Sequence, residues 1–178
     1  MVYIILGSGF EPIEAIAPCD ILRRGGVEVR FAGIGGRVIQ AAHGITVQAD
    51  CTVDEIRKED MEMIMLPGGM GGVHSMLGCE SVLELVKYAW EHDRFVTAIC
   101  AAPTILAKLH ITDGRKAVCY PGLEEQMGTA IMQNADAVCD GKIITGRAPG
   151  AAYNFGLALL AALKGEQTAA DVKKGLVY

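Results

Sequence analysis

Two side chains in this sequence have the chemistry and the setting of a reactive pair, Cys100 and Glu14. Cys100 ends the apolar run Phe95–Ile99 and is followed by Ala101-Ala102-Pro103, where a helical run begins. A nucleophile at such a strand-to-helix turn is exposed on a sharp bend, close to backbone N–H groups and to the positive end of a helix dipole. The sequence therefore predicts that Cys100 is a nucleophilic thiol.

Glu14 has the sequence position of a buried carboxyl group. It lies one turn into a predicted helix, Glu11–Arg24, and this helix closely follows the first predicted strand. Its neighbours at helical spacing are apolar, namely Ala17, Pro18 and Ile21. A carboxylate there is unfavourable without a partner, so we expect Glu14 beside Cys100, where a protonated carboxyl would donate a hydrogen bond to the thiolate. The alternative is a glutamate that only complements the helix dipole.

A glycine pair follows another apolar strand, Met63–Leu66, in the loop Pro67-Gly68-Gly69. Glycines let the backbone approach a ligand and direct N–H groups at an anion. This loop is therefore a candidate oxyanion hole for a carbonyl attacked by Cys100. No lysine follows in the pattern of a phosphate-binding loop. The alternative is a flexible turn between a strand and a helix.

A general base for the thiol is not evident from the sequence. The four histidines, at positions 43, 74, 92 and 110, are not sequence neighbours of Cys100. His43 lies between two short predicted strands and His74 follows the glycine loop, so both are candidates for approaching the site. The other two lie at predicted helix C-termini, where solvated histidines are common.

The other five cysteines have weaker claims to chemistry. Cys119 and Cys139 lie in predicted strands and are expected to be core thiols, while Cys19 lies inside the first predicted helix. Cys51 and Cys79 lie in predicted loops, where we expect exposed, oxidisable thiols. The absence of a CxxC pair argues against a zinc site and against a thioredoxin-type motif.

Short apolar segments alternate with helical ones along the chain. The predicted strands are 2–6, 27–32, 37–40, 45–48, 63–66, 95–99, 117–120, 137–139 and 142–145; the predicted helices are 11–24, 54–58, 81–92, 104–109, 121–127, 151–163 and 168–174. This alternation predicts one α/β domain over residues 1–178, with a mostly parallel sheet covered by helices on both faces. Ligands of such sheets lie at the carboxyl ends of the strands, where Gly68 and Cys100 fall.

Composition excludes several classes of function. The chain has 178 residues, of which 51% are hydrophobic and 21% charged, and its net charge is −5. These values are typical of a globular protein and argue against nucleic acid as the main partner. No apolar run approaches the roughly 18 residues of a membrane span, and the N-terminus lacks the basic region of a signal peptide. We therefore expect a cytoplasmic protein with reduced thiols, and we find no pattern for a metal, flavin or nucleotide.

Four ordered motifs resemble the ThiJ/PfpI family, in the branch that contains Parkinson disease protein 7 and bacterial ThiJ proteins. They are Gly9-Phe-Glu-Pro-Ile-Glu14, Leu66-Pro-Gly-Gly69, Ala98-Ile-Cys-Ala-Ala-Pro103 and Arg147-Ala-Pro-Gly-Ala-Ala-Tyr-Asn-Phe-Gly156. The resemblance runs in register over nearly the whole chain. It implies a flavodoxin-like three-layer sandwich related to class I glutamine amidotransferases, usually assembled as a homodimer.

The resemblance also implies roles for particular residues. Cys100 corresponds to the reactive cysteine at the family's nucleophile elbow, and Glu14 to the glutamate that hydrogen-bonds its thiolate. Gly68, Gly69 and the amide of Ala101 correspond to the backbone anion pocket.

The activities of the family give the functional expectation. Its members are linked to oxidative-stress protection, with the cysteine oxidised to sulfinic acid. They are also described as glyoxalases without a cofactor, and a deglycase activity is assigned to them. The resemblance thus implies a small carbonyl substrate or peroxide and no cofactor; the alternative is a redox sensor or chaperone-like homodimer without turnover.

One position departs from the family pattern. Close relatives often carry a His-Pro pair near the cysteine, and here the pair is Tyr120-Pro121. Tyrosine, with a reference pKa of about 10, is a poor base near neutrality, although it donates hydrogen bonds to an oxyanion or a cysteine oxide. Tyr120 and His43 are therefore auxiliary candidates. Ala101 stands where the protease-like branch has histidine, which argues against proteolysis.

Overall fold

A seven-stranded sheet forms the centre of the computed structural model, which describes residues 1–178. Its strands, in the spatial order β10-β11-β7-β6-β1-β2-β5, are β10 (Ala137–Asp140), β11 (Ile143–Gly146), β7 (Phe95–Ile99), β6 (Met63–Leu66), β1 (Val2–Leu6), β2 (Val29–Gly33) and β5 (Cys51–Thr52). All neighbours pair in parallel except β10 and β11, which form an antiparallel hairpin. The predicted mostly parallel sheet is confirmed.

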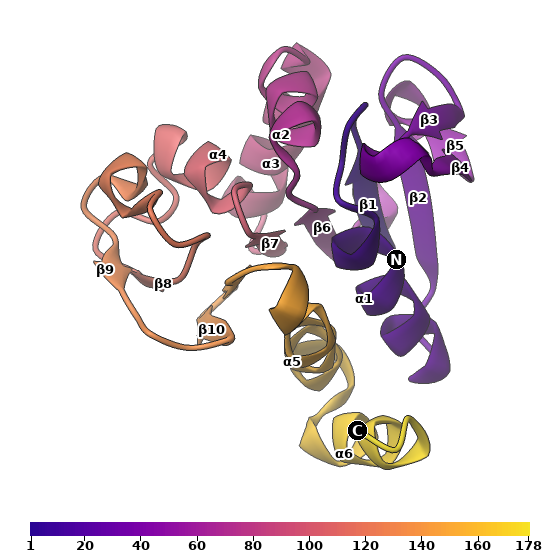
Figure 1. The fold of residues 1–178 in the computed structure, drawn as a ribbon, viewed down its shortest axis with the longest axis vertical. Coiled ribbons are helices and arrows are strands. Elements are labelled where there is room, and N and C mark those ends of the chain that lie inside the picture. The colour runs from indigo at the N-terminus through magenta and orange to yellow at the C-terminus, as the bar shows by residue number, and fades with distance from the viewer.

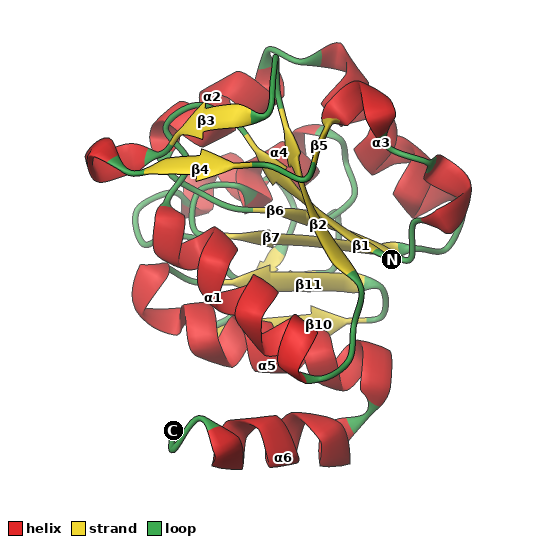
Figure 2. Cartoon of the chain, turned by 90° about the vertical axis from the view of Figure 1, so that its right-hand side faces the viewer, coloured by secondary structure: helices red, strands yellow, loops and turns green.

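Helices cover both faces of this sheet (Figures 1 and 2). On one face α1 (Pro12–Arg24) packs against α5 (Ala152–Lys164), which also contacts α6 (Glu166–Gly175). On the other face lie α2 (Met70–Leu77), α3 (Glu80–Glu91) and α4 (Pro103–Lys108). Strands buried on both faces are apolar throughout, as in β1 and β6, because neither side of the strand meets water. None of the helices combines the length and the hydropathy that a membrane span requires.

Helix α2 is an element that the sequence analysis did not predict. It contains Gly71 and Gly72, which disfavour a helix by intrinsic propensity. Close packing explains the glycines, because a Cβ atom on Gly72 would lie 2.8 Å from Phe10 Cα and one on Gly71 would lie 3.0 Å from Gly9 Cα. Tertiary contact with the loop after β1 therefore outweighs local propensity here.

The remaining strands form two small sheets. The two short strands predicted over 37–40 and 45–48 are present as β3 (Val38–Gln40) and β4 (Thr46–Gln48), which pair antiparallel, and β8 (Lys116–Ala117) pairs with β9 (Ile131–Met132). The strand predicted over 117–120 is wrong beyond Ala117, because the following N–H groups bond elsewhere. The Val118 N–H donates to Thr145 Oγ1 at 2.9 Å, and the Tyr120 N–H donates to the Cys100 carbonyl at 2.7 Å.

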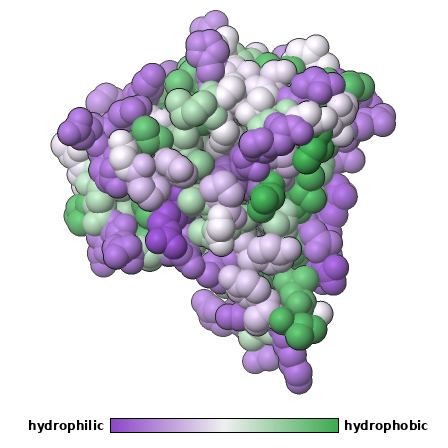
Figure 3. All heavy atoms as spheres, viewed as in Figure 1, coloured by the Kyte–Doolittle hydropathy of each residue, from purple (hydrophilic) through white to green (hydrophobic).

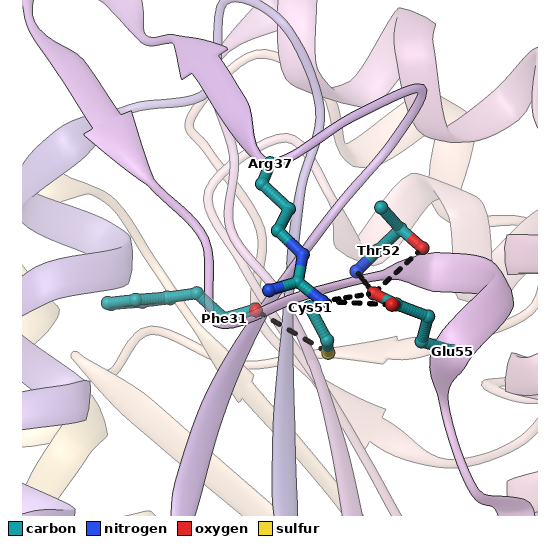
Figure 4. Close-up of polar contacts among 5 residues, drawn as sticks. All are labelled: Phe31, Arg37, Cys51, Thr52 and Glu55. Atoms are coloured by element: carbon teal, nitrogen blue, oxygen red, sulfur yellow. Dashed lines mark hydrogen bonds and ion pairs between the residues drawn. The ribbon is translucent and has the colours of Figure 1, made fainter.

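The helix predicted over 54–58 is also wrong as a single element. It is replaced by two 3₁₀ turns, η2 (Val53–Glu55) and η3 (Lys58–Asp60). The Glu55 carboxylate closes the first turn by accepting the Thr52 N–H at 2.7 Å and the Arg37 guanidinium at 2.9 Å (Figure 4). These hydrogen bonds lower the pKa of Glu55, with the backbone bond the larger cause. The capping carboxylate thus connects the end of β5 to the loop after β2.

Two predictions about the other cysteines are wrong. Cys51 is buried, because it belongs to β5 and its Sγ lies 3.7 Å from the Phe31 carbonyl oxygen (Figure 4). Cys139 is exposed, because β10 is an edge strand of the sheet. Cys119 and Cys19 are buried, and Cys79 is partly buried at the start of α3.

Candidate active site at Cys100

Cys100 stands at the bend between β7 and α4, as expected for a nucleophile at a strand-to-helix turn. Its φ is 66°, in the left-handed region that residues with a Cβ atom rarely adopt. Hydrogen bonds on both sides hold it there: its N–H donates to the Gly146 carbonyl at 2.9 Å, and its carbonyl accepts the Tyr120 N–H at 2.7 Å. Strained residues of this kind are concentrated at functional sites.

Glu14 is fully buried on α1 and meets Cys100 across Gly68. A Cβ atom on Gly68 would lie 2.5 Å from Glu14 Oε2 and 2.7 Å from Cys100 Cβ, so both groups border the space of one missing side chain. The Gly68 N–H donates to Glu14 Oε2 at 2.8 Å. The other carboxyl oxygen, Oε1, is buried without a hydrogen-bond partner. A proton shared with the neighbouring thiol would satisfy this oxygen.

The ionisation of these two groups is coupled. Burial raises the pKa of Glu14 to about 7, with the nearby Cys100 thiol and the Gly68 N–H opposing the rise. Burial, followed by the negative charge of Glu14, raises the pKa of the Cys100 thiol to about 12. The neutral thiol therefore favours ionisation of Glu14, whereas the ionised Glu14 disfavours ionisation of the thiol. A thiolate at this site requires that Glu14 keep a proton, which is the state in which the carboxyl donates to sulfur.

This raised pKa has a measurable consequence for stability. The folded-state pKa of Glu14, about 7, lies above the ordinary value of 4.5, so between these values the folded protein holds a proton that the unfolded chain releases. The contribution of this group to stability is complete below about pH 4.5 and is lost as the pH rises towards 7, by on the order of 3 kcal/mol. Urea unfolding at about pH 5 and about pH 7.5 should show this loss in the wild type but not in Glu14→Gln.

A matched variant tests whether the loss belongs to Glu14. Glu91→Gln removes an exposed glutamate at the end of α3 and should follow the wild type at both pH values. An equal change in unfolding free energy for the wild type and Glu14→Gln would contradict the assignment.

A cavity of about 420 Å³ opens above Cys100. Five segments of the chain line it, and the lining residues are Glu11, Gly69, Met70, Cys100, Ala101, Tyr120, Pro121, Gly122, Leu123 and Pro149. The structure thus brings Gly69, Ala101 and Tyr120 together with Cys100, as the sequence analysis expected.

The backbone donors near the sulfur differ in one respect from the expected anion pocket. Hydrogen bonds from the backbone at Gly69 and Ala101 lower the pKa of Cys100 in opposition to burial, so both N–H groups lie close to Sγ. Gly68 does not line the cavity, and its N–H is already bonded to Glu14. Gly68 therefore supports the site through Glu14, and the N–H groups of Gly69 and Ala101 remain as donors for an oxyanion.

His43 lies outside the cavity, but it contacts Glu11, which lines it. Its Nε2 is 3.4 Å from Glu11 Oε2, and its side chain is 75% exposed. His74 is exposed on α2, and His110 pairs with Asp113 at 2.9 Å. No histidine lines the cavity, and its polar side chains besides Cys100 are Glu11 and the half-exposed Tyr120.

Glu11 is the site residue that sequence reasoning missed. It precedes Pro12 at the start of α1, and its side chain is only 16% exposed. Its N–H donates to the Gly68 carbonyl at 3.0 Å, which joins the loop after β1 to the loop after β6. The available signal was an acidic residue in the same short motif as Glu14, at the carboxyl end of the first strand.

Comparison with known proteins places this arrangement among relatives. A family model described as DJ-1/PfpI family matches residues 1–162. Protein dj-1beta of Drosophila melanogaster is 33% identical over 98% of this chain and 95% of that protein, and its crystal structure superposes with a TM-score of 0.93 at 32% identity, covering 99% of this chain and 96% of that one. A Pyrococcus abyssi protein named a deglycase is 32% identical over 85% of this chain and 92% of its own length.

Proposed function

The chain belongs to the DJ-1/PfpI family, and we propose that it acts on small reactive carbonyl compounds through Cys100. The observation that carries this proposal is the junction of Cys100 and Glu14 across Gly68, directly beneath a cavity open to solutes. A nucleophile, a proton carrier and two backbone donors are the parts that carbonyl addition needs. The relative named a deglycase supports the same class of activity.

The chemistry begins with addition of the thiol to an aldehyde. The Sγ–C bond forms as the carbonyl π bond breaks, and the N–H groups of Gly69 and Ala101 stabilise the oxyanion. The thiol proton reaches the new alkoxide through Glu14, giving a hemithioacetal. A pKa of about 7 suits Glu14 to accept and return a proton near neutrality.

A 2-oxoaldehyde continues from the hemithioacetal to a hydroxy acid. Glu14 removes the proton from the hemithioacetal carbon while the neighbouring carbonyl oxygen gains a proton, which gives an enediol. The second carbon then takes up a proton and the first hydroxyl loses one, which leaves a 2-hydroxy thioester on Cys100. Water then attacks the thioester, and the C–S bond breaks to release the 2-hydroxy acid and the thiol. The net change is addition of one water, so the sequence of steps needs no oxidant and no cofactor.

Conversion of methylglyoxal to lactate tests this proposal directly. The wild-type protein should form lactate, followed by NMR, and Glu14→Gln should lower kcat by about 10²- to 10⁴-fold, because glutamine carries no exchangeable acid proton. Glu91→Gln, on the exposed end of α3, is the control and should keep wild-type activity. Lactate formation that survived in both Cys100→Ala and Glu14→Gln would overturn the proposal.

The backbone donors at Sγ also favour a second function, oxidation sensing at the same thiol. The thiolate attacks a peroxide oxygen and the O–O bond breaks, which gives sulfenic acid and a hydroxide that takes a proton from solvent to become water. Gly69, Ala101 and the protonated Glu14 would then hydrogen-bond the sulfur-bound oxygen. Mass spectrometry after mild peroxide should find Cys100 oxidised ahead of the exposed Cys139, and the reverse order would count against a sensor.

We further propose that the partner is a second copy of the chain. Apolar side chains are exposed on the outer face of α1, Ile13 and Ile16, and on the neighbouring β3–β4 region, Val38 and Ile45. Hydrophobic atoms lie right of centre in Figure 3, over the part of the molecule where Figure 1 draws these elements. Sedimentation should give twice the chain mass of 18.9 kDa, and Ile16→Lys should reduce it; a wild-type monomer would refute the homodimer.

A further inference from the structure

We propose that Glu11 makes the Cys100 cavity selective against carbonyl compounds that bear a carboxylate. The choice of carbonyl compounds as substrates rests on the proposed function, whereas the charge selection rests on the cavity itself. Glu11 is the one charged residue among those that line the cavity. Its carboxylate is largely shielded from water, at 16% exposure, so it acts on an entering charge with little screening.

The charges around the cavity do not cancel that of Glu11. Beside the cavity wall, the Glu124 carboxylate accepts the Gly122 N–H at 2.8 Å. Two basic residues are already engaged elsewhere: His43 pairs with Glu11 from an exposed position, and Arg147 is paired with Asp136 and lines a separate cavity. An anion that enters the cavity therefore encounters the Glu11 carboxylate, and no basic side chain in the lining neutralises that charge.

The position of Glu11 is rigid, while the one ion pair of its side chain is with the exposed His43. The backbone is held by the hydrogen bond to the Gly68 carbonyl and by Gly69, where a Cβ atom would lie 2.6 Å from the Glu11 nitrogen. The carboxylate caps no N–H group of α1. Glutamine at this position therefore removes the charge and keeps the shape and the backbone contacts.

The rest of the lining indicates the preferred substituent. Met70 and Tyr120 line the cavity and are exposed, and Leu123 and two prolines complete an apolar wall. We infer a substrate class of uncharged 2-oxoaldehydes with an apolar substituent. A 2-oxo acid such as glyoxylate presents the same reactive aldehyde with a carboxylate attached, and Glu11 disfavours it.

The experiment uses two alkylating agents that differ by one charge. Iodoacetamide and iodoacetate both form an S–C bond with Cys100 and release iodide, and neither requires carbonyl turnover. Their rates at Cys100 are measured by mass spectrometry at one pH, in the wild type and in Glu11→Gln, both with Cys139 replaced by alanine. Because both agents react with the same thiol, any change in its pKa cancels in the ratio of the two rates.

Glu11→Gln should raise the iodoacetate-to-iodoacetamide ratio by about five- to tenfold at low salt, and the gain should shrink at about 0.5 M salt. Glu11→Asp, which keeps the charge, should stay near the wild-type ratio. Glu28→Gln, an exposed glutamate before β2, is the matched control and should leave the ratio unchanged. An unchanged ratio in Glu11→Gln would overturn the role of Glu11.

A second measurement separates this inference from the proposed function. Glyoxylate can form the hemithioacetal but has no second carbonyl carbon to receive the proton, so it should inhibit methylglyoxal turnover competitively, and its inhibition constant should fall by a similar factor in Glu11→Gln. If the alkylation ratio changes while methylglyoxal is not turned over, the charge selection holds and the proposed function fails. If methylglyoxal is turned over while the alkylation ratio and the inhibition constant stay at their wild-type values, the proposed function holds and the selectivity role of Glu11 fails.

Discussion

Replacing Cys100 by alanine is expected to lower kcat/KM for methylglyoxal by on the order of a thousandfold or more, to the level of the uncatalysed reaction. Without Sγ no hemithioacetal forms, and Glu14 has no adduct on which to move a proton. Alanine keeps the Cβ atom, so the strained backbone with φ of 66° and its hydrogen bonds to Gly146 and Tyr120 are retained. The effect should therefore be confined to chemistry.

Two controls accompany this measurement. Cys139→Ala removes the exposed thiol at the sheet edge and should leave methylglyoxal consumption unchanged. Urea unfolding of Cys100→Ala should still be cooperative, which separates lost chemistry from lost structure. Full activity in a folded Cys100→Ala protein would contradict a covalent role for this cysteine.

Replacing Gly68 by alanine should produce the largest loss of stability, by about 3 kcal/mol, together with loss of activity. The new Cβ atom would lie 2.5 Å from Glu14 Oε2, 2.7 Å from Cys100 Cβ and 3.0 Å from the Ile99 carbonyl oxygen. No neighbour can move aside to relieve these contacts. Glu14 is fully buried, and the other two atoms lie at the strained bend. Alanine must therefore separate the carboxyl group from the thiol or displace the backbone.

The control for this variant is Gly36→Ala, where a Cβ atom would meet no atom within 4 Å. Urea unfolding free energies and the alkylation rate of Cys100 are measured for both variants. Gly36→Ala should remain close to the wild type in both. Wild-type stability and reactivity in Gly68→Ala would refute the tight junction on which the candidate site depends.

These predictions share one physical basis, the burial of an acid beside a thiol. Burial raises the pKa of both groups, so a proton stays available between Glu14 and Cys100. The raised pKa of Glu14 also lowers the free energy of unfolding near neutrality. The same burial explains why one backbone N–H, that of Gly68, is used to hold the carboxyl group in place. A site of this kind is assembled for proton transfer at the cost of folding free energy.

Much of the architecture was predictable because central strands have unambiguous patterns. β1, β6 and β7 have the predicted bounds, since strands buried on both faces are short apolar runs that end at glycine, proline or a reactive residue. Their parallel arrangement then places Cys100, Glu14 and Gly68 at the same end of the strands, because the carboxyl ends of parallel strands lie together. The approximate location of the site followed from local sequence alone.

Contacts between distant segments account for what the sequence analysis missed. The glycine-rich helix α2 forms because Gly72 packs on Phe10, and Cys51 is buried because β5 pairs with β2. Cys139 is exposed because its strand lies at the edge of the sheet, and periodicity within one segment does not report which strand is at the edge. Burial of these residues is a property of the neighbours they acquire on folding.

The sequence by itself determined the α/β class and the family and named Cys100 and Glu14 as the candidate pair, because those depend on patterns that lie within single segments. Only the tertiary structure decided that the Gly68 N–H bonds to Glu14, that His43 lies outside the cavity and that Glu11 lines it. The bond between Gly68 and Glu14 joins residues 54 positions apart. Such contacts, and the pKa values that burial creates, depend on distances between segments, and these exist only once the chain has folded.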